Sequence, residues 1–183
     1  MNIPNLITVV RILLVPLLAI FLLEGKFALA LLVFLVAGVS DGLDGLLARL
    51  LKQQTRLGAI LDPLADKALL VTAFVILAVL GVVPSWLAVL VVSRDMLIMA
   101  GIAVLLLHKR EVVFQPFFVS KLTTFSQLAT VAFVLGRDYL TTFSGLGDYL
   151  IVVTAILTVV SAGCYVVRGL QLLSGRDNEI KSE

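Results

Sequence analysis

Charged residues are scarce in this chain of 183 residues, because Asp, Glu, Lys and Arg together make up only 14% of it. A soluble globular domain carries about 25%. Hydrophobic residues make up 61% of the sequence, and the mean hydropathy is +1.14. The shortage of charge therefore excludes an ordinary soluble domain and predicts an integral membrane protein.

Cysteine and histidine are almost absent, since Cys164 and His108 are the only residues of these types. A single cysteine cannot form an internal disulfide. Zinc is held in proteins mainly by clustered Cys and His side chains. The sequence therefore predicts neither a disulfide framework nor a zinc site.

Long apolar segments account for nearly the whole chain. A helix needs about 20 mainly apolar residues to cross roughly 30 Å of hydrocarbon, and six such segments can be placed, separated by turn-forming or charged residues. We therefore predict an all-α integral membrane protein, a six-transmembrane-helix bundle with one membrane domain (1–173) and a cytoplasmic tail (174–183). The predicted spans are Ile3–Leu23, Phe27–Leu51, Gly58–Val83, Trp86–Leu107, Pro116–Leu135 and Tyr149–Leu173.

The distribution of Lys and Arg predicts the orientation, because short cytoplasmic loops carry an excess of these residues. With a cytoplasmic N-terminus, eight Lys and Arg residues fall on the cytoplasmic side and two on the other. Both termini are therefore expected in the cytoplasm. A cleavable signal peptide is disfavoured, since no cationic region precedes the first apolar segment and Arg11 lies inside it.

Four aspartates flank the predicted loop between the second and third spans. Asp41 and Asp44 are three residues apart and Asp62 and Asp66 are four apart, so each pair shares a helix face. Two antiparallel helices joined by a short loop bring both pairs to one depth. Charge at membrane depth is costly and marks a working site. Carboxylate oxygens suit Mg²⁺ or Mn²⁺, which we expect here.

Small residues accompany the aspartates. Gly45, Ala48 and Gly58 permit close approach of helices or of a flat or phosphorylated ligand. Asp62 followed by Pro63 also fits a helix cap with proline in the first turn. A cap would account for one aspartate, but not for four.

The spacing of these residues resembles the signature of the CDP-alcohol phosphatidyltransferases, DxxDGxxAR, eight residues, then GxxxDxxxD. All eight fixed positions are present, at Asp41, Asp44, Gly45, Ala48, Arg49, Gly58, Asp62 and Asp66. The resemblance covers essentially the whole chain, because such enzymes have six membrane helices and a site facing the cytoplasm.

The resemblance implies an enzyme that transfers a phosphatidyl group from CDP-diacylglycerol to an alcohol and releases CMP, with Mg²⁺ or Mn²⁺ as cofactor. It makes Asp41, Asp44 and Asp62 metal ligands, and Asp66 the catalytic base and a further ligand. The positions that it implies for CDP binding are Asp44, Gly45, Ala48, Arg49 and Gly58.

The flanking residues resemble the phosphatidylglycerophosphate synthases within this family, whose acceptor is glycerol 3-phosphate. The similar segments are SDxLDGxLAR (40–49), DPxADK (62–67), NxxTxxR (5–11) and KxxTxxQ (121–127). A phosphorylated acceptor needs cations, and the available ones inside helices are Arg94, Lys121 and Arg11. Arg94 could instead pair with Asp95 or with a neighbouring helix, Lys121 could snorkel to the interface, and Arg11 could lie on a partly interfacial helix.

Other functions stay open at this point, including a weaker third choice within the family, transfer to an inositol phosphate. A cardiolipin synthase of the same family would use phosphatidylglycerol as the acceptor. A small ion or proton-coupled transporter could also hold buried charges, but the acids cluster in one layer instead of tracking across the membrane. The expected partners are CDP-diacylglycerol, glycerol 3-phosphate and membrane lipids, with no nucleic acid. By resemblance we expect a homodimer in the bacterial cytoplasmic membrane.

Overall fold

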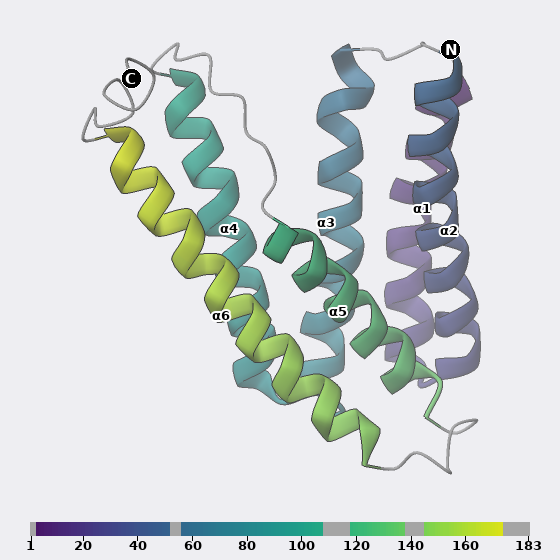
Figure 1. The fold of residues 1–183 in the computed structure, drawn as a ribbon. Helices are drawn as coiled ribbons and strands as arrows, with labels where there is room; N and C mark the ends of the chain where they lie inside the picture. The colour runs from purple at the N-terminus through teal and green to yellow at the C-terminus, as the bar shows by residue number, and fades with distance from the viewer. Residues whose placement is uncertain (1–2, 52–55, 108–117, 138–144, 174–183) are drawn as a thin grey trace.

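A computed structural model of the protein describes residues 3–51, 56–107, 118–137 and 145–173. For residues 3–9, 41–51, 56–64, 66, 102–107 and 170–173 it describes the backbone alone. The described residues form six α-helices (Figure 1), as the sequence predicts. Their bounds are α1 Ile3–Leu23, α2 Phe27–Leu51, α3 Arg56–Val79, α4 Ser85–Leu107, α5 Phe118–Leu135 and α6 Leu146–Leu173.

Two glycines in left-handed conformations terminate helices. Gly25 has φ 70° after α1 and Gly81 has φ 69° after α3, a region that a residue without Cβ enters at no steric cost. The predicted third span ran to Val83, whereas α3 ends at Val79. Hydropathy extends the span too far because the residues after the turn are as apolar as the helix.

The helices form two groups joined by α5. In Figure 1, α1, α2 and α3 run side by side, α4 and α6 lie together, and α5 crosses between the groups. α1 packs on α2 and α3, α4 packs on α3 and α6, and α5 packs on α6 and α2. The first turn of α1, the end of α2, the start of α3 and the end of α6 lie at one end of the bundle (Figure 1). We call it the α2–α3 end.

The apolar core centres on α3. Phe74 and Leu77 of α3 are completely buried, together with Leu18 and Leu22 of α1 and with side chains of α2, α4 and α5. α1 runs without interruption through Pro16, and Arg11 on this helix is only 1% exposed. Arg11 therefore packs inside the bundle, and its depth in a membrane stays a prediction.

The interface between α5 and α6 is built from buried hydroxyl groups. The hydroxyl of Thr154 lies 2.5 Å from that of Ser126 and 2.8 Å from that of Thr130. Thr123 donates to the carbonyl oxygen of Leu157 on the facing helix at 3.1 Å. Such pairs satisfy polar groups between helices where the surroundings are apolar.

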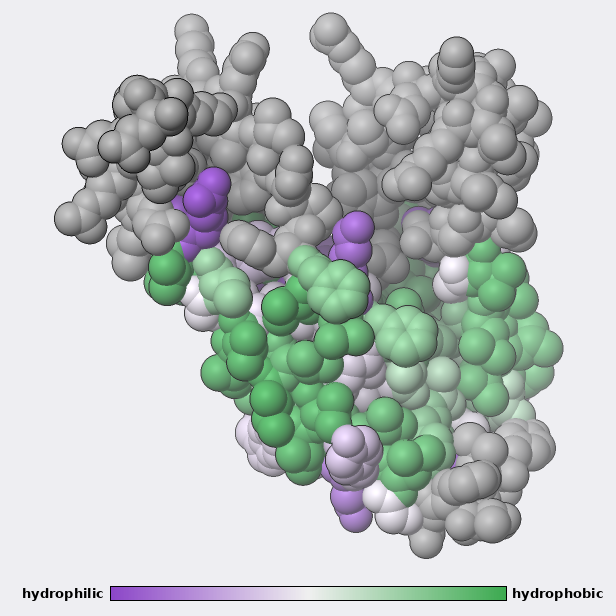
Figure 2. Space-filling view, viewed as in Figure 1, coloured by the Kyte–Doolittle hydropathy of each residue, from purple (hydrophilic) through white to green (hydrophobic). Residues whose placement is uncertain are grey.

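The outer surface of the helices is apolar. Figure 2 shows hydrophobic residues over most of the visible described face, with hydrophilic ones near its two ends. Within the described ranges, the segments Phe118–Leu135 and Leu146–Gly169 are long and apolar enough to cross a membrane, and shorter apolar stretches cover Val10–Leu23, Phe27–Ser40 and Lys67–Val79. Six spans and two cytoplasmic termini stay predictions.

Candidate functional site

The four aspartates of the signature lie on two helices that the bundle brings to one end. α2 carries Asp41 and Asp44 in its C-terminal half, and α3 carries Asp62 and Asp66 in its N-terminal half. These halves both belong to the α2–α3 end (Figure 1). The antiparallel arrangement predicted for this pair of helices is therefore present in the backbone.

The side chains of these aspartates lie outside the described part of the structure, and so do Gly45, Ala48, Arg49 and Gly58 beyond their helical backbone. Among the side chains that are described, no three His, Cys, Asp or Glu residues form a group able to hold a metal ion. The metal-binding and CDP-binding roles therefore stay predictions.

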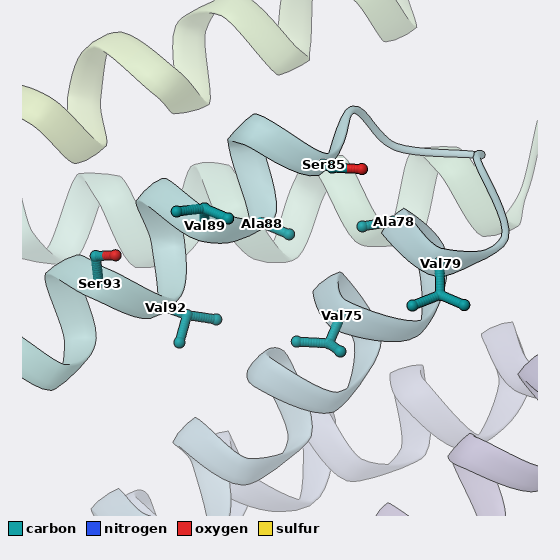
Figure 3. Close-up of a pocket in the computed structure, with 8 residues that line it drawn as sticks. All are labelled: Val75, Ala78, Val79, Ser85, Ala88, Val89, Val92 and Ser93. Atoms are coloured by element: carbon teal, nitrogen blue, oxygen red, sulfur yellow. The ribbon is translucent and has the colours of Figure 1, made fainter.

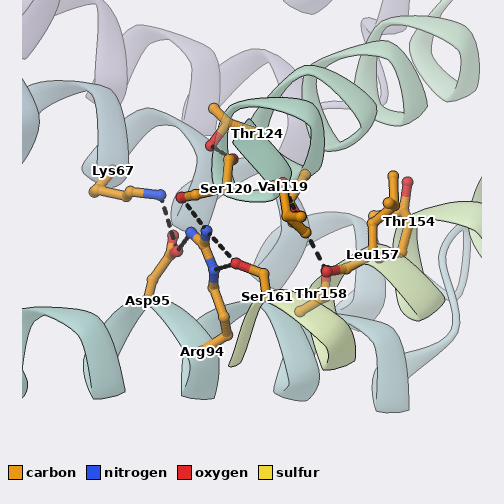
Figure 4. Close-up of polar contacts among 11 residues, drawn as sticks. Lys67, Arg94, Asp95, Val119, Ser120, Thr124, Thr154, Leu157, Thr158 and Ser161 are labelled. Carbon is orange, nitrogen blue, oxygen red and sulfur yellow. Dashed lines mark hydrogen bonds and ion pairs between the residues drawn. The ribbon is translucent and has the colours of Figure 1, made fainter. Parts of the chain in front are cut away.

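A cluster of charges begins at the residue after Asp66. Lys67 Nζ on α3 donates to Asp95 Oδ1 on α4 at 2.8 Å. Arg94 Nη1 donates to the same oxygen at 2.7 Å. Figure 4 shows Lys67 and Arg94 pointing at Asp95 from opposite sides. We call these three residues the Lys67–Asp95–Arg94 cluster.

Arg94 also forms hydrogen bonds with residues of α5 and α6. Its Nη2 donates to Ser120 on α5 at 2.6 Å and to Ser161 on α6 at 2.8 Å, and its Nε contacts Ser161 at 3.2 Å (Figure 4). The ring of Tyr165 lies 5.8 Å from the guanidinium carbon, within reach of a cation–π contact. The cluster therefore ties α3 and α4 to α5 and α6.

Burial makes these pairings necessary. The side chains of Arg94 and Asp95 are each 2% exposed, whereas that of Lys67 is 23% exposed. An isolated charge in such surroundings is costly, and removing one partner of a buried pair leaves the other uncompensated. The cluster thus has a buried side, made of Arg94 and Asp95, and an accessible side, made of Lys67.

The three cations predicted for the acceptor phosphate occupy different environments. Arg94 pairs with Asp95, which was the alternative expectation for it. Lys121 is exposed on α5, directly after Ser120, and Arg11 is buried in α1. Their role toward a phosphate stays a prediction.

Sequence reasoning missed several polar residues of α5 and α6. Ser120 and Ser161 were not singled out, although each binds Arg94. Gln127 entered the sequence analysis only as the last residue of the KxxTxxQ segment. It is completely buried, and neither its amide nitrogen nor its amide oxygen has a hydrogen-bond partner in the described part of the chain. The available signal was the recurrence of polar residues within otherwise apolar helices.

A separate apolar pocket of about 370 Å³ lies between α3 and α4. Figure 3 shows its walls, which come from Val75 to Val79 on α3 and from Ser85 to Ser93 on α4. Val75 is nine residues beyond Asp66 on the same helix, more than two turns toward the other end of the bundle. On α3 the pocket therefore lies away from the aspartates of the signature, whereas on α4 its wall reaches Ser93, the residue before Arg94.

Comparison with known proteins gives a family match for most of the chain. Residues 1–161 match the family model for CDP-alcohol phosphatidyltransferase. The chain is 36% identical over 184 residues to the probable phosphatidylglycerophosphate synthase of Mycobacterium tuberculosis, covering 95% of this chain and 84% of that protein.

Two further relatives carry different names. The chain is 36% identical over 180 residues to the CDP-diacylglycerol–glycerol-3-phosphate 3-phosphatidyltransferase of Aquifex aeolicus, covering 94% of this chain and 98% of the relative. It is 37% identical over 128 residues to the putative cardiolipin synthase of Mycobacterium tuberculosis, covering 68% of this chain. The chain spans only 60% of the length of this cardiolipin synthase relative.

Proposed function

The chain belongs to the CDP-alcohol phosphatidyltransferase family, and on that premise we propose that it transfers a phosphatidyl group from CDP-diacylglycerol to glycerol 3-phosphate and releases CMP. The observation that carries this proposal is the complete signature with its aspartates on α2 and α3, at one end of the bundle. Two relatives that match over 95% and 94% of the chain bear names for this reaction.

The donor set at this end of the bundle fits a divalent metal, which the family generally uses. Hard cations such as Mg²⁺ and Mn²⁺ prefer carboxylate oxygens, and we assign Asp41, Asp44, Asp62 and Asp66 to hold the ion. When bound, a metal ion offsets negative charge at the phosphorus centre and on the leaving group.

The remaining chemistry is assigned to residues of this chain. Asp66 takes the proton of the acceptor hydroxyl as the acceptor oxygen forms its bond to phosphorus and the bond to CMP breaks. The nucleotide is bound at Asp44, Gly45, Ala48, Arg49 and Gly58. Because this is a direct displacement, both substrates must occupy the α2–α3 end together.

The acceptor phosphate is assigned to Arg94, Lys121 and Arg11. A guanidinium has five N–H donors, and the bonds of Arg94 to Asp95, Ser120 and Ser161 engage four of them. Arg94 therefore offers the phosphate one remaining donor and its charge, whereas the exposed Lys121 offers a whole ammonium group.

The setting proposed for this reaction is the membrane, since CDP-alcohol phosphatidyltransferases are membrane proteins. We propose six spans, an active site that faces the cytoplasm of a bacterial cell, and a homodimer. The apolar described surface supports contact with lipid. Reaction of single introduced cysteines with an impermeant reagent in intact cells tests the orientation: Arg137→Cys should react, whereas Arg176→Cys should not.

The proposed reaction is tested by CMP release from the purified protein with CDP-diacylglycerol and Mg²⁺ or Mn²⁺. Glycerol 3-phosphate, phosphatidylglycerol and inositol phosphate are compared as acceptors. Turnover with glycerol 3-phosphate alone is expected. Turnover with phosphatidylglycerol alone would make the chain a cardiolipin synthase, the alternative that the 37% identical relative favours, and no CMP with any acceptor would overturn the proposal.

A further inference from the structure

Lys67 is the accessible member of the Lys67–Asp95–Arg94 cluster. Its side chain is 23% exposed, whereas those of Asp95 and Arg94 are each 2% exposed. An ammonium group has three N–H donors, and one of them binds Asp95 Oδ1. Asp95 is the only partner of Lys67 in the described part of the chain, and its other two donors have no partner there.

Asp95 determines where the ammonium of Lys67 lies. A lysine has a long, flexible side chain that loses much rotamer freedom when it is held in one place. Asp95 is itself held by Arg94, whose guanidinium is bound by Ser120 and Ser161. The position of the Lys67 ammonium is therefore set by a chain of contacts that reaches α5 and α6 (Figure 4).

The charges of the cluster do not cancel. Two cations share one carboxylate, which leaves a formal excess of one positive charge within the cluster. The side chain of Arg94 is 2% exposed and that of Lys67 is 23% exposed, so this excess is more accessible at Lys67. A positive charge in a partly buried position favours an anionic oxygen, because charge-assisted hydrogen bonds are the strong ones.

We propose that Lys67 binds an anionic phosphate oxygen of a substrate and that Asp95 is the residue that positions its ammonium. The inference rests on the proposed function, because Lys67 is one residue beyond Asp66 and so lies at the same level of α3, about 1.5 Å further along the helix axis. Two sources share this chemistry: the phosphate of the acceptor and the diphosphate of CDP-diacylglycerol. The accessible ammonium binds the oxygen, and Asp95 acts through Lys67 without touching the substrate.

The first experiment compares Lys67→Met with Lys26→Met in steady-state kinetics of the purified full-length protein. Lys26 is a matched control, because it also forms a Lys–carboxylate pair, with Glu24 at 2.7 Å, but lies in the exposed turn after α1. Lys67→Met should raise one KM by about 10- to 100-fold, the loss expected for a hydrogen bond to a charged group, with a smaller change in kcat. Lys26→Met should change neither.

The substrate whose KM rises identifies the source of the oxygen. A rise for glycerol 3-phosphate assigns Lys67 to the acceptor phosphate, and a rise for CDP-diacylglycerol assigns it to the diphosphate. Lys67→Arg, which keeps the charge, should recover part of the lost affinity. Unchanged KM values for both substrates in Lys67→Met would overturn the proposal.

The positioning role of Asp95 is tested by non-additivity. Asp95→Asn should raise the same KM that Lys67→Met raises. In the double variant this KM should exceed the value for Lys67→Met by no more than about threefold. Asp95→Glu keeps the charge that Arg94 needs but shifts the carboxylate, so it carries this test if Asp95→Asn does not fold. If the KM increases of the two single variants multiplied in the double variant, or if Asp95→Asn raised only the KM of the other substrate, the positioning role would be overturned.

Failure of the proposed function remains distinguishable from failure of this inference. If the unmodified protein released no CMP with any acceptor, binding would be read from the Tm, with CDP and glycerol 3-phosphate as probes. One probe should raise the Tm of the unmodified protein and of Lys26→Met, but not of Lys67→Met. No shift in the unmodified protein, or equal shifts in all three, would overturn the inference.

Discussion

The two halves of α3 do different work. Its N-terminal half carries Asp62, Asp66 and Lys67, and Lys67 reaches Asp95 on the next helix. Its C-terminal half carries Phe74 and Leu77, which are completely buried among apolar side chains. One continuous helix thus joins a charged layer to an apolar core.

The two layers hold the helices together in different ways. Apolar packing between helices gains little from the hydrophobic effect in lipid, because lipid tails are as apolar as the side chains. Contacts such as those of Arg94 with Ser120 and Ser161 require particular partners at particular positions. We therefore expect the charged layer to select one arrangement of helices, whereas the apolar core fills the space between them.

Breaking the chemistry of the charged half should have the largest effect. Asp66→Asn should lower kcat by about 100- to 10,000-fold, the usual contribution of a general base, without changing the fold. CMP release measures kcat, and the far-UV circular dichroism spectrum checks that the fold is unchanged. Glu24→Gln makes the same chemical change in the exposed turn after α1 and should keep full turnover. Unchanged turnover in Asp66→Asn would remove its assignment as the base.

Breaking the apolar half should affect stability instead of chemistry. Phe74→Ala leaves a cavity, and such changes cost about 3–5 kcal/mol in soluble proteins. We expect about 1–3 kcal/mol here, because the unfolded reference state in detergent or lipid is also apolar. Unfolding in a denaturing detergent measures this, with Val79→Ala as a control since Val79 is 77% exposed. Comparable losses in both variants would contradict the position of Phe74 in the core.

Gln127 on α5 is a buried polar residue whose amide has no hydrogen-bond partner in the described part of the chain. Gln127→Met removes a buried amide without hydrogen bonds while keeping a similar side-chain volume. We expect a gain of about 1 kcal/mol in the free energy of unfolding, because the desolvation cost of the amide disappears. Leu128→Met, at a half-buried apolar position, should be close to neutral. A loss of stability at Gln127 would reveal a polar partner.

The smallest effect is expected in the α5–α6 interface. Thr154→Val removes a hydroxyl that contacts Ser126 and Thr130. We expect it to lower the free energy of unfolding by about 0.6 kcal/mol and by no more than about 1.7 kcal/mol, the average and the maximum for interhelical hydrogen bonds in membranes. Thr124→Val is the matched control, because its hydroxyl binds a carbonyl of its own helix. Equal unfolding free energies for these variants would show that the interhelical hydroxyl contacts add nothing.

The sequence predicted the helices well because hydropathy and helix length are linked in a membrane protein. The bounds of α1 and α2 agree with the predicted segments Ile3–Leu23 and Phe27–Leu51. The error at the end of α3 has a physical cause, because the turn at Gly81 depends on backbone conformation, which a hydropathy count does not register.

The candidate site was predictable only in part. The spacing of the aspartates placed them on two antiparallel helices, and the adjacent Arg94 and Asp95 suggested an ion pair, which is present. The bond from Lys67 to Asp95 joins residues 28 positions apart. It depends on the rotation of α3 against α4, which helix packing decides and local spacing does not.

The shared carboxylate of Asp95 has a consequence for how the chain enters a membrane. A single charged side chain near the centre of a spanning helix costs about 2.5–3.5 kcal/mol during insertion. α4 carries an acid beside a base, and α3 supplies a second base to the same oxygen across a turn formed by residues 80–84. Each helix inserted alone would bring charge without its full set of partners. Inserted together as a hairpin, α3 and α4 would supply these counter-charges to each other, so we expect the two helices to enter the membrane as one unit.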